Sequence, residues 1–335
     1  MKKHRMYRIT GWIIASILVI CMVSGCGGGG GGSSKDSEGN GGSSSPYSGL
    51  TTQVLITDKN SKDIMEEAYE GGQTGSSMNV LGSEQFHPSY SLKYPITIYL
   101  SRMIHAAFCN LDLSSGVAIP AEASAVVHLL NKTVNGECGG SYTISADIDS
   151  VTGSISSGSI IYNDYCKGGV LESGSFDFTG EINLITMEMN LDFTFTDCTQ
   201  TEGNDSETIN GTASFASTLT TLTLTFKDLY VRDNTLDKTA WFNNFVMTST
   251  EESADSLMTM NGRFYAPDSG YIDLSTESPL VILTDDENPS DGVLVAMGRN
   301  NTKARLTALT SMTYKVDADT NGDGVYDWDS GTLNW

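Results

Sequence analysis

The sequence holds little positive charge. Its 335 residues include 19 Lys and Arg against 41 Asp and Glu, which gives a formal net charge of -22 at pH 7. A surface this acidic repels phosphate backbones and anionic lipid headgroups, so we expect neither nucleic-acid binding nor a polybasic membrane patch. Divalent cations and cationic partners remain compatible with this charge.

The short motifs of common enzymes are also missing. None of the 4 histidines belongs to a His-Glu-x-x-His motif, and the chain has no Gly-x-Ser-x-Gly elbow, P-loop or dinucleotide-binding glycine motif. The sequence therefore favours a protein that is not an enzyme. A hydrolase that works through paired carboxylates stays an alternative, because spacing in sequence does not report separation across a sheet.

A long apolar run stands near the N-terminus. It extends from Ile9 to Val23 and follows four basic residues, which is the pattern of a secretory signal. It is short for a membrane-spanning helix, which needs about 20 apolar residues. The run ends in Val-Ser-Gly-Cys at 23–26, which resembles the lipobox of bacterial lipoproteins. This resemblance implies that residues 1–25 are removed and that Cys26 carries the lipid; an ordinary signal peptide is the alternative.

Composition divides the remaining chain into a tether and one domain. Residues 26–46 hold the lipidated cysteine and a Gly/Ser-rich stretch, which cannot bury enough apolar surface to order itself. As a random coil this tether has an r.m.s. reach of about 25 Å. The residue directly after the cysteine is Gly27 and not Asp. By resemblance to the sorting of enterobacterial lipoproteins, this implies that the chain is sent to the outer membrane. Residues 47–335 form a single extracytoplasmic domain, with a helical part over about 47–135 and a sheet over about 138–335.

Two helices are predicted in the first part of this domain. The first runs from Lys62 to Glu70, with Asn60 or Ser61 as the N-cap and Gly71 as the stop. The second follows Pro95, where apolar residues recur every three or four positions from 100 to 111.

A two-residue period replaces the helical pattern from Cys138 onward. Apolar residues alternate with polar ones from Ile185 to Thr196, and shorter alternating segments recur up to Val316. Such alternation is typical of an antiparallel sheet with one solvated face. The predicted fold class is mainly β: a long antiparallel meander sheet, curved or partly closed, with two short N-terminal helices packed on it. A weak repeat supports a meander of related hairpins, because Gly174, Gly211 and Gly262 each precede an alternating segment.

Four cysteines remain in the exported domain. An even number in an oxidising compartment predicts two disulfides, and the spacings fit no zinc motif. In an up-and-down meander Cys138 and Cys166 flank adjacent strands, so they are the preferred pair. Cys109 would then join Cys198 and connect the second helix to the sheet. The other two pairings stay open.

An acidic segment near the C-terminus resembles the first half of an EF-hand-type calcium loop. Its oxygen-bearing side chains stand mostly at alternate positions around a glycine turn, as a hard cation requires. The predicted ligands are Asp317, Asp319, Asn321, Asp323 and Asp327. Trp328 occupies the twelfth position, where a bidentate carboxylate is expected. An acidic β-hairpin turn is therefore the alternative.

Several motifs together resemble a group of uncharacterised β-rich proteobacterial outer-membrane lipoproteins. They are Cys-Gly-Gly-Ser at 138–141, Tyr-Asn-Asp-Tyr-Cys at 162–166, Ile-Asn-Gly-Thr at 209–212, Gly-Tyr-Ile-Asp-Leu at 270–274 and the closing acidic hairpin. The resemblance covers roughly residues 55–335 and implies the fold and the compartment, without an activity.

The sequence thus favours a non-enzymatic cell-envelope lipoprotein, held at the outer membrane by its lipid, that has a structural role or binds a protein partner. A carrier of a lipid or other hydrophobic ligand is the first alternative, because an amphipathic sheet must cover its apolar face. The carboxylate-based hydrolase is the second.

Overall fold

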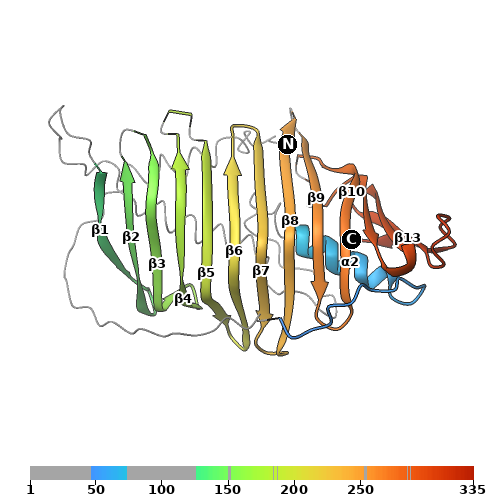
Figure 1. Cartoon of the computed structure of the whole chain (residues 1–335), viewed down its shortest axis with the longest axis horizontal. Helices are drawn as coiled ribbons and strands as arrows, with labels where there is room; N and C mark the ends of the chain where they lie inside the picture. The colour runs from blue at the N-terminus through green and yellow to red at the C-terminus, as the bar shows by residue number, and fades with distance from the viewer. Residues whose placement is uncertain are drawn as a thin grey trace, which may run out of the picture.

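A single large antiparallel sheet dominates the molecule. The computed structural model describes residues 47–73, 126–149, 152–183, 185–186, 188–252, 255–284, 286 and 288–335. Fourteen strands lie in the sheet in the order of the sequence, so each strand pairs with its neighbours along the chain (Figure 1). The predicted meander is confirmed. The sheet is not closed, because β1 and β14 lie at opposite edges and do not pair with each other.

The strands are mostly long. They are β1 (Val126–Asn135), β2 (Gly139–Asp149), β3 (Ser154–Lys167), β4 (Val170–Ile182), β5 (Met189–Glu202), β6 (Asp205–Ser217), β7 (Thr221–Asp233), β8 (Lys238–Glu252), β9 (Asp255–Ala266), β10 (Gly270–Ile282), β11 (Asp291–Met297), β12 (Lys303–Thr310), β13 (Thr313–Asp319) and β14 (Trp328–Asn334), with a 3-10 turn, η2 (Arg299–Asn301), between β11 and β12.

Alternation along the strands separates two faces of the sheet. In β5 the side chains of Met189, Leu191, Phe193 and Phe195 are buried, and the residues between them are exposed. Buried apolar side chains continue from β2 to β13 as one core cluster, which defines the inner face. The opposite, outer face carries mostly Ser, Thr, Asn and Asp. The predicted amphipathic sheet is therefore present.

One helix, α2 (Ser61–Gln73), packs on the inner face. It is the single α-helix in the described part of the chain, and it contacts β9, β11, β12 and β13. Ile64, Met65, Ala68 and Tyr69 are its buried apolar residues. The first predicted helix is thus confirmed, although it continues through Gly71 instead of stopping there. The second predicted helix lies outside the described residues. No helix in the described ranges is long and apolar enough to span a bilayer.

Glycines of the weak repeat lie opposite bulges in the neighbouring strands. A Cβ on Gly174 would lie 2.1 Å from the carbonyl oxygen of Asp197, and one on Gly211 would lie 2.0 Å from that of Asp228. Gly262 approaches the backbone of Asn244 in the same way. The pairing register shifts beside each of these contacts. The repeat therefore marks positions where bulged strands leave no room for a side chain.

One predicted strand boundary was wrong. Ile185 was expected to begin the strand that contains Phe193, but β5 begins at Met189. Asn183 instead closes a turn, since its side-chain oxygen accepts the amides of Ile185 and Thr186 at 3.0 and 3.1 Å. Ile185 is left 93% exposed.

Both edges of the sheet carry features that oppose the addition of another strand. Among the described strands, β1 pairs only with β2, and its register shifts between Leu129 and Lys132. Lys132 lies opposite Ile144, a buried inner-face residue, so its charge is on the apolar side of the edge. β14 has only 7 residues and also pairs through a register shift. Bulges, short strands and inward charges all protect sheet edges against aggregation.

Lys132 provides a test of this protection. Replacement of Lys132 by Val should allow the β1 edges of two molecules to pair. In the wild-type protein such pairing would bury the charge of Lys132, and the variant lacks this charge. We expect dimers and larger species in light scattering after size exclusion. Lys227→Val is the control, since it removes a lysine from the central strand β7; equal association of both variants would contradict the role of Lys132.

Candidate functional site

The predicted calcium ligands lie in the connection between β13 and β14. Asp319 is 1% exposed and closes this turn: its two side-chain oxygens accept the amides of Gly322 and Gly324 at 2.7 and 2.8 Å. Gly324 has a φ of +90°, a conformation that glycine adopts readily. The Asn321 side chain accepts the amide of Asp323 at 2.9 Å. The segment is therefore a tight hairpin turn held by its own side chains.

Two of the predicted ligands already interact with other residues. The carboxylate of Asp317 is 2.8 Å from the Arg305 guanidinium and 3.1 Å from the Lys315 ammonium. Asp327 accepts the amide and the hydroxyl of Thr320, and these hydrogen bonds, the backbone one first, lower the pKa of its carboxyl.

Calcium binding stays a prediction. Within the described ranges, no group of three or more His, Cys, Asp or Glu side chains is arranged to hold a metal ion. Counting from Asp319 and from Asp317 places oxygen-bearing side chains at positions one, three and five and a glycine at position six equally well. The count from Asp319 also places Asp327 at position nine, but Ser330 then stands at position twelve, where a bidentate carboxylate is expected.

The calcium hypothesis can be tested by thermal unfolding. Calcium at about 100 times its Kd would raise the free energy of unfolding by about 2.7 kcal/mol. This would raise the melting temperature by roughly 4–5 °C for a domain of this size. Asp319→Asn should abolish the rise. An unchanged melting temperature in calcium and in chelator would leave the segment as a turn only.

One predicted disulfide is present. Cys138 and Cys166 are bridged, with a Cα–Cα distance of 5.1 Å. The bond joins the residue directly before β2 to the end of β3, as the meander predicted. Cys198 differs from the prediction, because it is a free, buried thiol that donates to the carbonyl oxygen of Ser175 at 2.9 Å. Burial raises the pKa of this thiol to about 12. Its predicted partner Cys109 lies outside the described residues, as does Cys26.

An aromatic row crosses the outer face near one end of four strands. Tyr230, Trp241, Tyr265 and Tyr271 lie opposite one another on β7, β8, β9 and β10. Ring centroids are 5.6 Å apart for Tyr230 and Trp241 and 4.0 Å apart for Trp241 and Tyr265, and both pairs are stacked. Since the stacked rings face each other, this aromatic row holds the strands together and does not present a flat platform to a ligand.

Charged groups flank the aromatic row. Asp228 accepts hydrogen bonds from the Trp241 ring nitrogen and the Tyr230 hydroxyl. Arg263 lies 4.0 Å from the centroid of the Tyr271 ring and forms a two-point ion pair with Asp273. The hydrogen bonds that Arg263 donates to Asp273 are the main reason why the pKa of Arg263 is raised.

Tyr47 fixes the start of the described chain against this row. Its ring lies 5.6 Å from Trp241 and 5.5 Å from Tyr265, and its hydroxyl donates to the carbonyl oxygens of Leu50 and Ala266. Thr52 and Val54 then form backbone hydrogen bonds with Tyr271, and the chain continues to α2 on the inner face. The sequence did not predict this contact, although Tyr230 and Trp241 stand at the polar positions of alternating strands.

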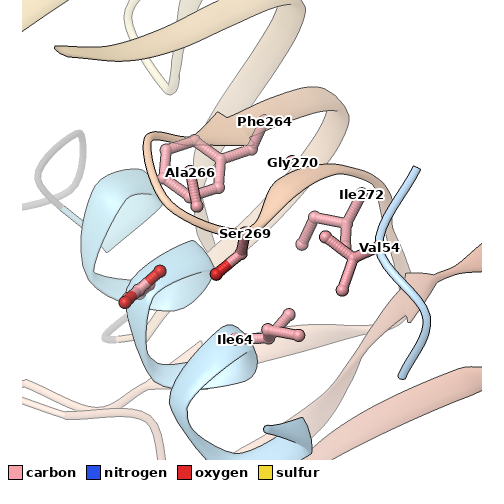
Figure 2. A pocket seen from close by; sticks show the side chains of 8 residues that line it. Val54, Ile64, Phe264, Ala266, Ser269, Gly270 and Ile272 are labelled. Atoms are coloured by element: carbon pink, nitrogen blue, oxygen red, sulfur yellow. The ribbon is translucent and has the colours of Figure 1, made fainter. Parts of the chain in front are cut away.

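A small cavity lies between α2 and the β9–β10 hairpin. Figure 2 shows Val54, Ile64, Phe264 and Ile272 around it, with the Ser269 hydroxyl on one side. The cavity has a volume of about 10 Å³, which suits about one water molecule. Glu67 also lines it, and burial, followed by repulsion from Asp63 and Asp268, raises the pKa of its carboxyl to about 7. The cavity is too small for an organic substrate.

Comparisons with known proteins add no assignment. No family model, curated protein or solved structure matches the chain.

Proposed function

We propose that the chain is a non-enzymatic lipoprotein of the cell outer membrane that has a structural role or binds a protein partner. The observation that carries this proposal is the position of Tyr47. The residue directly after the expected tether is fixed on the outer face, beside the β9–β10 turn. A lipid on Cys26 would therefore hold the sheet by one end and leave its polar outer face available to a partner.

The two alternatives have less support. A carrier needs room on its apolar face, but Phe176 and Phe226 on the inner face are only 0% and 1% exposed. A hydrolase needs two carboxylates across a cleft, and the cavity beside Glu67 has room for about one water.

Lipid attachment is the decisive test. The full chain, expressed in a bacterium supplied with labelled palmitate, should incorporate the label and separate with the outer membrane. Cys26→Ser should lose the label, because only a thiol accepts the diacylglycerol. The control is Cys198→Ser, which should still be labelled. An unlabelled wild-type chain, or a labelled Cys26→Ser variant, would contradict the proposal.

A further inference from the structure

Three neighbouring turns form one end of the central part of the sheet. They follow β4, β6 and β8 and lie in a row at the top of Figure 1. We call this row the upper ridge; its described residues are 183, 185–186, 188, 218–220, 251–252 and 255. We propose that the upper ridge binds a basic amphipathic helix of a protein partner. This inference rests on the proposed function, because it names the kind of partner and the surface that binds it.

Aliphatic side chains stand at the tips of two of these turns. Ile185 is 93% exposed and Leu219 is 79% exposed, and no other large apolar side chain in the described ranges is as exposed as these two. Turn positions are usually polar, and neither turn needs an aliphatic residue to form. The two side chains therefore offer apolar area that a partner would cover.

Hydrogen bonds fix the conformation of both turns. The Asn183 side chain accepts the amide of Ile185 at 3.0 Å, and the Asn183 amide donates to the carbonyl oxygen of Glu188 at 2.8 Å. In the next turn the Thr218 hydroxyl accepts the amide of Thr221 at 3.1 Å. A partner that binds turns held in this way loses less conformational entropy than one that must order a loop.

The charge of the upper ridge is negative. Glu188 is exposed and closes the turn that carries Ile185. Glu251 is exposed beside the turn that carries Leu219, since its amide donates to the carbonyl oxygen of Thr220 at 2.7 Å. None of the ion pairs between described residues includes either carboxylate. Each aliphatic tip thus has an exposed negative charge beside it.

Basic side chains stand in other parts of the same strands. From β4 to β9 they are Lys227, Arg232, Lys238 and Arg263. Arg232 and Lys238 lie next to the turn at the opposite end of β7 and β8, where Arg232 pairs with Asp237, and the other two lie inside strands. The upper ridge has no basic residue of its own, so it attracts a cationic partner and repels an anionic lipid surface.

The spacing of the two tips fits an α-helix. Met189 at the start of β5 pairs with Ser217 at the end of β6, so the two turns extend from neighbouring strands. The centres of these turns are two strand spacings apart, which is about 10 Å. Residues seven positions apart on a helix share one face and are about 10.5 Å apart. Two apolar residues of the partner at this spacing would reach Ile185 and Leu219, and basic residues beside them would reach the carboxylates.

A helix suits the upper ridge better than an extended peptide does. An extended peptide binds by adding a strand to a sheet edge, where a row of backbone groups can accept it. The ends of strands offer no such row, and the backbone groups of Asn183, Thr218 and Thr220 are bonded within the ridge. A helix satisfies its own backbone hydrogen bonds and can therefore bind through side chains alone.

The test measures binding of a fluorescent helical peptide to the lipidated chain in phosphatidylcholine nanodiscs, with empty nanodiscs as the blank. The peptide consists of alanines with two leucines seven positions apart and lysines on the same face. We expect saturable binding in fluorescence anisotropy. Ile185→Ser/Leu219→Ser should weaken it about tenfold, because two apolar contacts are lost. Glu188→Gln/Glu251→Gln should weaken it about fivefold at low salt and reduce its dependence on ionic strength.

Matched controls separate the upper ridge from the general acidity of the chain. Asp164→Asn/Asp237→Asn removes two exposed carboxylates near the opposite end of the sheet, where both residues have a positive φ that Asn tolerates. Leu236→Ser removes the exposed leucine of the β7–β8 turn. Both variants should bind the peptide as the wild type does. A peptide whose leucines are five positions apart should bind about tenfold more weakly, since its leucines lie on different faces.

Two results would overturn the inference. One is the absence of saturable binding to the wild-type chain. The other is an equal loss of affinity in the ridge variants and in their controls, because binding would then depend on the total negative charge. Neither result affects the labelling of Cys26 by palmitate, which tests the proposed function separately.

Discussion

Replacement of Cys138 by Ser is expected to lower the free energy of unfolding by about 3 to 4 kcal/mol. The bond to Cys166 closes a loop with a sequence separation of 28. Loss of this cross-link gives the unfolded chain more conformational freedom, and the chain-entropy estimate for such a loop is about 3.5 kcal/mol. Urea denaturation of the wild-type and variant chains under oxidising conditions measures the difference.

A double-mutant cycle provides the control for this prediction. Cys166→Ser should lose as much stability as Cys138→Ser, and the double variant should lose no more than either, because all three lack the same bond. Additive losses would show that the two residues act independently. Two more reactive thiols in the unreduced wild-type chain than in the Cys138→Ser/Cys166→Ser variant, both under denaturant, would show that the bond does not form.

Local periodicity predicted the central part of the fold well. Alternation in segments such as that around Phe193 sets which side of a strand is buried, and short turns force each strand to pair with the next. The Cys138–Cys166 bond followed from this pairing, since both residues flank the same two strands. The order of the sheet needed no information beyond the sequence.

Contacts between distant segments could not be predicted in this way. Tyr47 and Trp241 are far apart in the sequence, and no periodic pattern relates them. Ile185 matched the alternation of β5, but two hydrogen bonds to the Asn183 side chain placed it in a turn. The acidic residues showed a calcium-like spacing, while the sequence did not show that Arg305 and Lys315 would pair with Asp317.

Glu67 should make the domain less stable as the pH rises from about 4.5 to 7. The pKa of its carboxyl is raised from 4.5 to about 7 in the folded chain, mainly by burial. In this range the folded chain keeps a proton that the unfolded chain has lost, so the free energy of unfolding falls as pH rises. Glu67→Gln removes the titrating group and should be about 1–3 kcal/mol more stable than the wild type at pH 8. Urea denaturation at several pH values measures this difference.

The pH range separates this effect from that of other carboxylates. Hydrogen bonds, chiefly from Lys227, lower the pKa of Asp192, so the stability contributed by that group is lost below its ordinary pKa of 3.8 and not between 4.5 and 7. Glu251→Gln is the matched control, because Glu251 is exposed at the end of β8. It should keep the wild-type slope between pH 4.5 and 7. If Glu67→Gln also kept that slope, Glu67 would be ionised in the folded chain at the same pH as in the unfolded chain, and the cavity beside α2 would be accessible to water.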